Sequence, residues 1–497
     1  MARAIDRTHF TPADYAAFAA RLELNLRALR LLLQRPGFGC GERTLGAELE
    51  MSIVGADGRA LGVNREVLAR CGAPRLALEL DQFNLEYNLA PVSASGRPFE
   101  SFEREITTAM ACANRGAEGL GGRIITIGIL PTLTEEELGS RALTDFTRYH
   151  ALAEGVRRLR HTPTAVRIQG ADAISLRTSE ITLEGANTSF QVHYRTDPRE
   201  FANSYNAAQM AIGVVLAACG NSPIFLGRRL WDETRIALFK QALDYRDFDA
   251  TRWRAPARVG FGHGWVREGA WELFAEGAAL FPPIFPICDD EDSLAVVAAG
   301  GVPQLSELRL HQGTVWRWNR AIYDHDAGGH VRVEMRALPS GPTPVDMVAN
   351  GAFLVGLTRA LADRVDQLLP AFPFAYAEFN FYRSAQQGLD AMLLWPATDV
   401  TESSPTEVAA PHAVLTALSL AAEGLAALGV EDSEAKRLLG IIRGRIETGQ
   451  TAARWQRRTL DHLLARHDRP DALAMLVEQY MANASSGRPV HEWSDIE

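Results

Sequence analysis

The chain has 497 residues, of which 47% are apolar, 23% are charged and 8% are aromatic. These fractions are typical of a folded globular protein and exclude collagen, coiled-coil and intrinsically disordered chains. The 51 basic and 61 acidic residues give a net charge of −10 without a basic stripe, so nucleic acid is not an expected partner.

The first predicted element is an amphipathic helix near the N-terminus. Thr11 is a favourable N-cap, Pro12 suits the first helical position, and Asp14 adds a negative charge to the first turn. Apolar residues then recur at spacings of three and four as far as Leu33, and Pro36 follows as a stop signal. We expect this apolar stripe to pack against the rest of the protein, with a partner interface as the alternative.

Four segments alternate strictly between apolar and polar residues. This period of two predicts strands with one face in a core and one polar face. The segments are residues 44–54, 82–89, 189–195 and 331–338. Their polar faces carry Glu48 with Glu50, Glu86 between two asparagines, Gln191 with His193, and Glu334 with Arg336.

Helical patterns fill most of the remaining chain. They cover residues 97–116, 132–156, 198–220, 344–369 and 403–482, the last with breaks near Gly429 and Asp468. Because the two ends are helical and the middle mixes strands with helices, the predicted fold class is α+β with a mainly antiparallel sheet.

The cysteines and the N-terminus indicate the compartment. Five widely spaced cysteines contain no CxxC pair, and their odd count and low density are typical of a reducing environment. The first ten residues lack the apolar core of a signal peptide, and the longest apolar run, residues 207–219, is too short to span a bilayer. We therefore expect a cytoplasmic protein without a membrane partner.

The common phosphate-binding and hydrolase motifs are missing. No GxxxxGK[ST], HExxH or GxSxG occurs, and the glycine clusters at 37–41 and 260–264 do not complete GxGxxG. If the protein uses ATP, it does so without a Walker loop or a Rossmann fingerprint.

The acidic strand faces favour a metal site. Glu48 and Glu50 point the same way on one strand, roughly 7 Å apart. Like charges held so close need a counter-charge, and Mg²⁺ or Mn²⁺ is the natural one because it prefers carboxylate oxygens. One such face alone is typical of a solvated strand, but four together favour a site.

Arginines accompany these carboxylates. Arg336 shares a strand face with Glu334, Arg320 lies shortly before that strand, and Arg235 follows an Asn-Ser-Pro turn. Metal ions and guanidinium groups together disperse charge in phosphoryl transfer. A single arginine is more often part of a surface ion pair.

These residues together resemble the glutamate–cysteine ligase family, in its plant-type and bacterial carboxylate–amine ligase branches. The resemblance covers about residues 44–480. It begins with a G-x-E-x-E strand at residues 46–50 and a second acidic strand with Glu86, and Asp81 as an outlier candidate. The later motifs are a strand at residues 188–193, an Asn-Ser-Pro turn at 221–223, Trp231 to Arg235, His311 and Thr314 before Arg320, Glu334 with Arg336, and residues 383–389.

The resemblance implies a glutamine-synthetase-like fold, shared with guanido kinases: a curved antiparallel sheet whose polar concave face is covered by helices. Residues 1–40 would be a helical extension, 41–400 the α+β catalytic domain, and 401–497 a helical region packed on it. The activity implied is an ATP- and Mg²⁺-dependent (or Mn²⁺-dependent) joining of a carboxylate, by family default the γ-carboxylate of glutamate, to an amine through an acyl phosphate.

The resemblance also implies roles for single residues. Arg320 and Arg336 would bind the nucleotide phosphates and act in catalysis together with Glu334. Substrate would contact Arg235, Gln191 and Glu86. The expected metal ligands are Glu48, Glu50, Glu86, His193 and Glu334.

Some positions depart from the family pattern. Gln191 stands where many bacterial members carry a first histidine, and Glu334-Met335-Arg336 continues into an unusual Ala-Leu-Pro-Ser-Gly segment, residues 337–341. Two alternatives remain: a guanido-kinase-type phosphotransferase on the same fold, and an inactive binding or regulatory homologue. Expected partners are a small amino acid and an amine, with a homo-oligomer possible.

Overall fold

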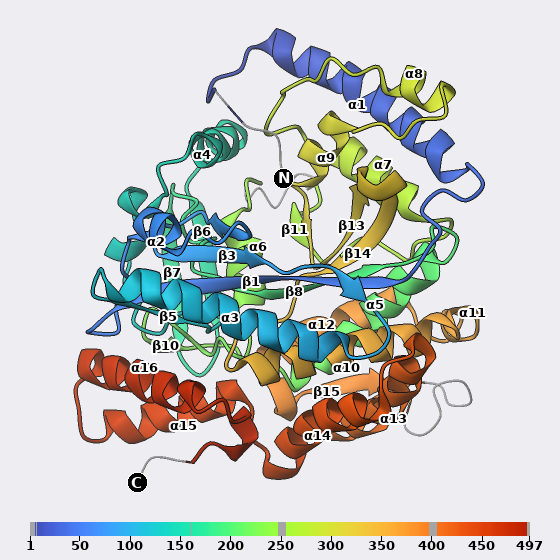
Figure 1. Cartoon of the computed structure of the whole chain (residues 1–497). Coiled ribbons are helices and arrows are strands. Elements are labelled where there is room, and N and C mark those ends of the chain that lie inside the picture. Colours follow the sequence, from blue (N-terminus) through green and yellow to red (C-terminus); the bar gives the residue numbers. More distant parts are fainter. Residues whose placement is uncertain (1–4, 6, 161, 247–254, 397–404, 495–497) are drawn as a thin grey trace.

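The computed structural model describes residues 5, 7–160, 162–246, 255–396 and 405–494. At its centre lies an eight-stranded sheet of order β13-β14-β8-β1-β3-β2, in which β4 and β5 also pair with β1 and every pair is antiparallel. The sheet curls, so that β13 and β14 rise steeply from the plane of β1 and β3 (Figure 1). These strands are β1 (Thr44–Gly55), β2 (Leu76–Leu78), β3 (Asn84–Asn88), β4 (Val92–Ser93), β5 (Gly122–Ile125), β8 (Phe190–Arg195), β13 (Asn319–Asp324) and β14 (His330–Met335).

The four predicted strands are therefore confirmed as β1, β3, β8 and β14, and the α+β class with a curved, mainly antiparallel sheet is confirmed with them. Eight short strands form separate two-stranded pairs. These are β6 (Thr164–Gln169) with β7 (Ala173–Thr178), β9 (Ile224–Phe225) with β10 (Arg228–Arg229), β11 (Val259–Gly260) with β12 (Trp316–Arg317), and β15 (Met392–Trp395) with β16 (Thr406–Ala409).

Helices lie on both sides of the sheet. In chain order they are α1 (Pro12–Leu33), α2 (Asn64–Cys71), α3 (Pro98–Glu118), α4 (Thr147–Leu159), α5 (Phe201–Ala217), α6 (Thr234–Ala242), α7 (Ala270–Leu280), α8 (Ser293–Ala298), α9 (Ser306–Gln312), α10 (Pro344–Ala362), α11 (Val365–Leu368), α12 (Phe374–Gln387), α13 (Ala410–Leu428), α14 (Asp432–Thr448), α15 (Ala452–Leu464) and α16 (Arg469–Ser485). Single 3₁₀ turns occur at Glu136–Leu138, Ser140–Ala142, Asp326–Gly328, Gly388–Asp390 and Val490–Glu492.

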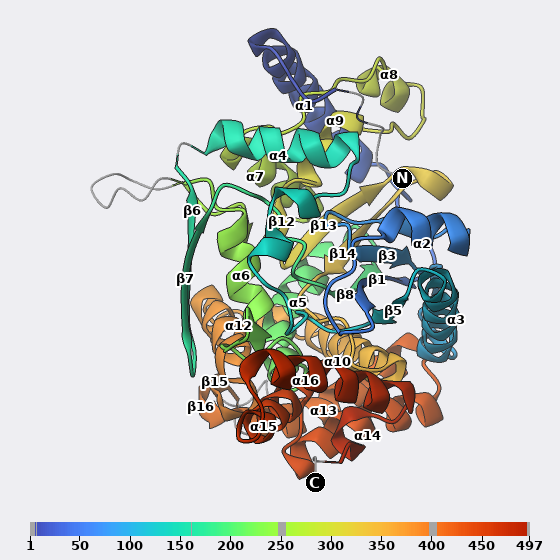
Figure 2. The ribbon, with the colours of Figure 1, turned by 90° about the vertical axis from the view of Figure 1, so that its left-hand side faces the viewer.

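The apolar face of the sheet rests on α3, α5 and α10, and α13 to α16 form the layer below them (Figures 1 and 2). The apolar residues of β1 are buried, as the alternation predicts. Gly351 of α10 faces Val192 and Phe190 of β8. The polar face is consequently the concave one, and it opens toward α4, α7 and α9 (Figure 1).

Helix α10 is the buried centre of the helical layers. Its N-cap Thr343 accepts a hydrogen bond from the backbone of Asp346. Both α10 and α13 are long and apolar enough to cross a membrane, judged by length and composition alone; the apolar windows are 94% and 39% buried in the protein, respectively. This is weak support for a membrane span, because a core helix meets the same test.

The predicted first helix is confirmed as α1. Thr11 and Asp14 form a capping box, and the helix packs on α7, α8 and α9. Its stripe buries Phe18, Leu22 and Leu29, as expected, and also Asn25, whose amide donates to Ser293.

Two predicted helices are wrong in part. The pattern over 132–156 forms only 3₁₀ turns before α4, because the Thr134–Glu137 cap is followed at once by an extended Gly139. In the segment 403–482, residues 406–409 form strand β16 instead of helix, since they pair with β15. An additional break lies at Gly449, which has a φ of 66°; residues 403 and 404 lie outside the described part.

A disulfide joins Cys71 at the end of α2 to Cys112 in α3.

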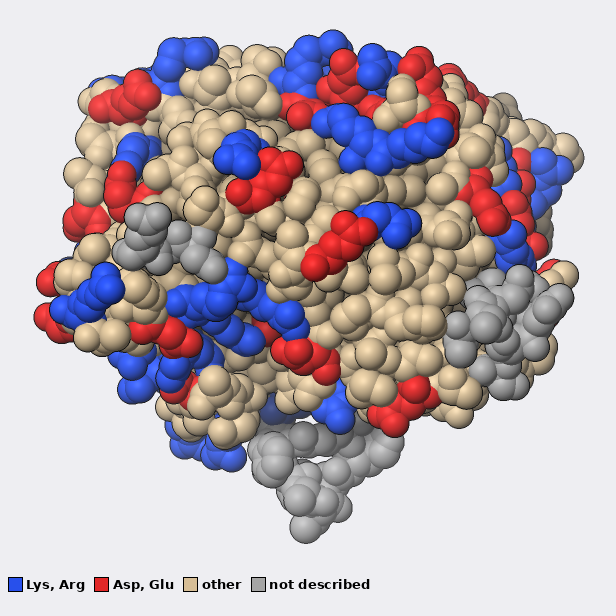
Figure 3. All heavy atoms as spheres, turned by 90° about the horizontal axis from the view of Figure 1, so that it is seen from below, with Lys and Arg blue, Asp and Glu red and all other residues tan. Residues whose placement is uncertain are grey.

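The lower side of the molecule, formed by the C-terminal helices, shows basic side chains beside acidic ones (Figure 3). Ion pairs that involve these helices include Arg364 with Glu423 and Arg454 with Asp390.

The contact between α10 and α13 gives a stability prediction. A Cβ on Gly424 of α13 would run into the carbonyl oxygen of Gly356 in α10. We expect Gly424→Ala to lower the free energy of unfolding by about 1–3 kcal/mol, because the two helices would have to separate. Gly440→Ala is the matched control: Gly440 is an exposed position of α14 with open space around it, and the substitution should stabilise by about 0.5–1 kcal/mol. Urea unfolding of both variants measures this, and equal midpoints would contradict the close helix contact.

Candidate active site

The sheet register gathers the polar side chains of five strands on one face. Residues that pair across strands share a face and lie side by side. The pairs are Glu48 with Gln191, Glu50 with Glu86, His193 with Glu334, and Glu334 with Arg320. We call the resulting group the polar face: Glu48, Glu50, Glu86, Gln191, His193, Arg320, Glu334 and Arg336.

Glu334 is held between two arginines. Arg320 donates from Nε and Nη2 to the two carboxylate oxygens of Glu334, at 2.7 and 3.0 Å, and Arg336 Nη1 donates to Oε2 at 3.0 Å. Burial opposes the charged form of Glu334, but the charges of Arg320 and Arg336 outweigh it and hold the pKa of this carboxyl well below its usual range. Glu334 is therefore ionised, and both guanidinium groups have fixed positions at its side.

Glu48, His193 and Glu334 are close enough to share a cation. One ligand atom from each lies within 4.8 Å of the others. His193 Nε2 is 3.2 Å from Oε1 of Glu48 and 3.7 Å from Oε1 of Glu334, without the alignment of a hydrogen bond to either. Carboxylate oxygens of this kind are the donors that Mg²⁺ prefers, so Glu48 and Glu334 fit such an ion.

Gln191 bridges an acid and a base. Its amide nitrogen donates to Oε1 of Glu50 at 2.9 Å, and its amide oxygen accepts from Arg336 at 2.5 Å. Glu50 Oε2 accepts from the backbone N–H of Ser189. Both ends of the Gln191 amide are thus engaged within the protein, and they fix the positions of Glu50 and Arg336.

The side of the polar face near β2 and β3 holds acids without arginines. Burial, followed by the charges of Glu48, Glu79 and Glu50, raises the pKa of Glu86 well above its usual value. Burial and neighbouring carboxylates also raise the pKa values of Glu79 and Glu184 to about 8 each. Within the described residues, no salt bridge involves Glu79, Glu86 or Glu184. This part of the face is therefore short of positive charge.

Sequence reasoning missed Glu79 and Glu184. Ala77 pairs with Glu86, and Glu79 follows Ala77 by two residues, so the alternation of leucines at 76, 78 and 80 was the available signal. Glu184 lies in a turn before β8, where no periodicity marks it. The outlier candidate Asp81 is fully buried beside Gly185, and neither of its carboxylate oxygens has a hydrogen-bond partner.

Arg235 lies at the start of α6 and is 3% exposed. Its Nη1 donates to Glu233 at 2.9 Å and to the carbonyl of Ala337 at 3.1 Å. Its charge lowers the pKa of Glu50, although burial raises that pKa overall. Arg235 is thus beside the polar face, with Nε among the buried atoms that have no partner.

The segment after Arg336, residues 337–341, is hydrogen-bonded to the backbone of the strand that carries Glu50. Ser340 donates its hydroxyl to the carbonyl of Glu50 at 2.6 Å, and Asn221 donates to the carbonyl of Ser340 at 2.7 Å. Gly341 has a φ of 77° and lies against the carbonyl of Thr126, which leaves no space for a side chain. The segment therefore ties β1 to the Asn-Ser-Pro turn.

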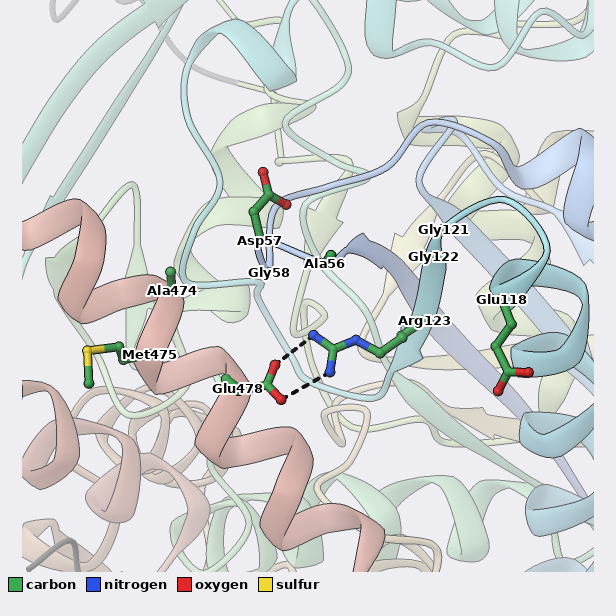
Figure 4. A pocket seen from close by; sticks show the side chains of 10 residues that line it. All are labelled: Ala56, Asp57, Gly58, Glu118, Gly121, Gly122, Arg123, Ala474, Met475 and Glu478. Atoms are coloured by element: carbon green, nitrogen blue, oxygen red, sulfur yellow. Dashed lines mark hydrogen bonds and ion pairs between the residues drawn. The ribbon is translucent and has the colours of Figure 1, made fainter.

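A surface cavity of about 650 Å³ lies elsewhere, where β1 ends beside β5 and α16. Its walls include Asp57, Glu118 and Met475, and the ion pair of Arg123 with Glu478 crosses it (Figure 4). None of the polar-face residues lines this cavity, so it is separate from the candidate active site.

Comparison with known proteins gives a family and a fold. A sequence profile described as glutamate–cysteine ligase family 2 matches residues 44–479. The structure is similar to the crystal structure of glutamate–cysteine ligase from Francisella tularensis in complex with AMP, with a TM-score of 0.51 and 11% identity over 90% of each chain. A bifunctional glutathione synthetase from Pasteurella multocida has a TM-score of 0.46 and 12% identity over 93% of this chain and 55% of that chain. No relative among curated proteins matches by sequence. The predicted glutamine-synthetase-like ligase fold is confirmed by the first likeness.

The acid-rich side of the polar face predicts a pH-dependent response to Mg²⁺. An unfolded glutamate has a pKa of about 4.3, whereas Glu79 and Glu184 hold their protons up to about 8 in the folded protein. The folded state therefore binds more protons, and the free energy of unfolding should fall as pH rises from about 4.3 to 8. A bound divalent cation displaces these protons, so it should raise the melting temperature more at about pH 8 than at about pH 6.

Thermal melts in EDTA and in Mg²⁺, at equal ionic strength, test this expectation. Glu79→Gln should reduce the difference between the Mg²⁺-induced shifts in melting temperature at the two pH values. An equal Mg²⁺-induced shift at both pH values would contradict the assignment of a cation to this side of the face.

Proposed function

The chain belongs to the glutamate–cysteine ligase family 2, and from this premise we propose that it joins a carboxylate to an amine at the expense of ATP. The observation that carries the proposal is the arrangement around Glu334: two fixed guanidinium groups on one side, and carboxylates that lack positive charge on the other. A site for polyphosphate and divalent cation together needs both halves.

The chemistry explains why no nucleophilic side chain is needed. A carboxylate is a poor acyl donor because its leaving group would be an oxide. Transfer of the γ-phosphoryl group of ATP to the carboxylate gives an acyl phosphate, which a free amine attacks with release of phosphate. The protein has to hold the two substrates in line and stabilise the charge that develops on the transferred group.

Each half of the polar face has a role in this proposal. Glu48, Glu50, Glu86 and Glu334 hold Mg²⁺ or Mn²⁺, which supplies positive charge to the phosphate oxygens. Arg320 and Arg336 bind the transferred phosphoryl group, and their ion pairs with Glu334 keep them in place before ATP binds. Glu79 and Glu184, which lie beyond Glu86, extend the half that lacks positive charge.

Arg235 binds the carboxylate of the amino acid, and its unpartnered Nε–H is the observation that supports this role. Gln191 orients Arg336 and Glu50, because both ends of its amide are already occupied. The substrates are small molecules, with the γ-carboxylate of glutamate as the first candidate.

ADP release tests the reaction class. We expect ADP to form only when a carboxylate and an amine are both present, because the acyl phosphate is consumed by the amine. A screen that pairs amino-acid carboxylates with amines, with ADP measured by a coupled assay, provides the test. ADP formation with a phosphorylated product and no amine requirement would favour the guanido-kinase-type alternative, and no ADP with any pair would favour a binding homologue.

Arg336→Lys tests the phosphoryl-binding role. Lysine keeps the charge but loses the planar donor pair, so turnover should fall by about 100-fold or more while nucleotide affinity changes little. Arg123→Lys, on the same sheet but beside the distant cavity, is the matched control and should keep wild-type turnover. A loss confined to nucleotide affinity would instead assign Arg336 to the bound ATP in its ground state.

A further inference from the structure

Arg332 of β14 lies next to His193 and is part of none of the roles above. Its Nε donates to Nδ1 of His193 at 3.0 Å, and its Nη1 donates to Oδ2 of Asp324 on β13 at 2.9 Å. Asp324, Arg332 and His193 therefore form a row across three adjacent strands, β13, β14 and β8, which ends at Glu48 and Glu334.

This row determines which nitrogen of His193 carries the proton. A guanidinium group has only donors, so Nδ1 has to accept with its lone pair. In a neutral imidazole the single hydrogen is then on Nε2. Nε2 is the nitrogen that faces Glu48 and Glu334, and the His193 side chain is only 9% exposed.

A metal-binding histidine has the opposite arrangement. Its coordinating nitrogen offers a lone pair, and the other nitrogen donates its hydrogen to a carboxylate, a carbonyl or water. At His193 the second nitrogen meets a donor instead of an acceptor. If Nε2 bound a cation, the imidazole would lose either its hydrogen bond with Arg332 or its last proton.

From the direction of the hydrogen bond between Arg332 and His193, we infer that His193 serves the site as a hydrogen-bond donor and not as a metal ligand. Arg332 is its positioning residue. Nε2–H is directed between Glu48 and Glu334 in the free protein, where neither carboxylate is aligned to accept it. It is available to an oxygen atom of a bound anion, and the cation is held by carboxylates alone. Only the identity of that anion, a phosphate oxygen of the nucleotide, rests on the proposed function.

The proton position can be measured without any ligand. In the metal-free protein with ¹⁵N-labelled histidine, the ring nitrogens of His193 are assigned with a His193→Gln sample. We expect a protonated Nε2 and an unprotonated Nδ1 that accepts a hydrogen bond. A proton on Nδ1, alone or together with Nε2, would overturn the inference.

Mn²⁺ serves as the metal probe. Electron spin echo modulation of Mn²⁺ bound to the wild-type protein should show no coupling to a histidine nitrogen. Loss of a true ligand or of its support costs about 10- to 100-fold in metal affinity, which we expect for Glu48→Gln, whereas His193→Gln should stay within about threefold of wild type. Histidine-nitrogen coupling in the wild type, or a tenfold loss in His193→Gln, would contradict the assignment.

Arg332→Gln provides a gain of signal. The amide oxygen of glutamine is as many bonds from the backbone as Nε of arginine, so it can accept a hydrogen from Nδ1 and leave the Nε2 lone pair free. We expect histidine-nitrogen coupling to Mn²⁺ to appear in this variant. Arg332→Lys retains a donor and should show none, and Arg123→Gln controls for the loss of an arginine from the sheet. If Arg332→Gln binds Mn²⁺ without the coupling, Arg332 does not position His193.

These measurements are independent of ligase activity. Failure to release ADP would overturn the proposed function and leave the nitrogen assignments standing, whereas an Nδ1 proton or a wild-type nitrogen coupling would overturn the role of His193 and leave the ligase proposal standing.

Discussion

Carboxylates from neighbouring strands share one face of a curled sheet, and the antiparallel register places them side by side. Glu50 pairs directly with Glu86, and Glu48 lies two residues away on the same strand. On the β13–β14 side the acids are neutralised by Arg320 and Arg336, while on the β2–β3 side burial and mutual repulsion raise the pKa values of Glu79 and Glu86. This division of charge makes one half of the face suited to anions and the other to cations.

The helices behind the sheet help to offset the free-energy cost of burying these charges. Burying like charges without full pairing is costly, and the burial of apolar surface elsewhere in the protein has to offset that cost. Here the apolar side of the same strands lies on α3, α5 and α10, and α10 is itself enclosed by α13 and α14. The unusual segment after Arg336 adds a direct support, since Ser340 binds the backbone of Glu50. The hydrophobic layers and the hydrogen bonds of the polar residues thus support the same strands from two sides.

Much of the sheet could be predicted because alternation is a local property. The strands that carry Glu48, Glu86, His193 and Glu334 all occur where a period of two predicts them. The helix pattern over 132–156 failed in its first part for a different reason: a good cap at Thr134 starts a turn, but the extended backbone of Gly139 ends it. Glu184 could not be found either, because a turn residue reaches the site only through the path of the folded chain.

The sequence by itself determined which side chains point to the polar side of each strand, and hence that acids, arginines and a histidine would share a face. It also determined the family, because the order of the motifs is written in the chain. The tertiary structure alone decided which side chains contact one another. Strand order brings Arg332 to Nδ1 of His193 and encloses Glu334 between Arg320 and Arg336. The local alternation determines which face a residue takes within a strand, but it does not determine which strands become neighbours, and the strand order β13-β14-β8-β1-β3-β2 joins segments far apart in the chain.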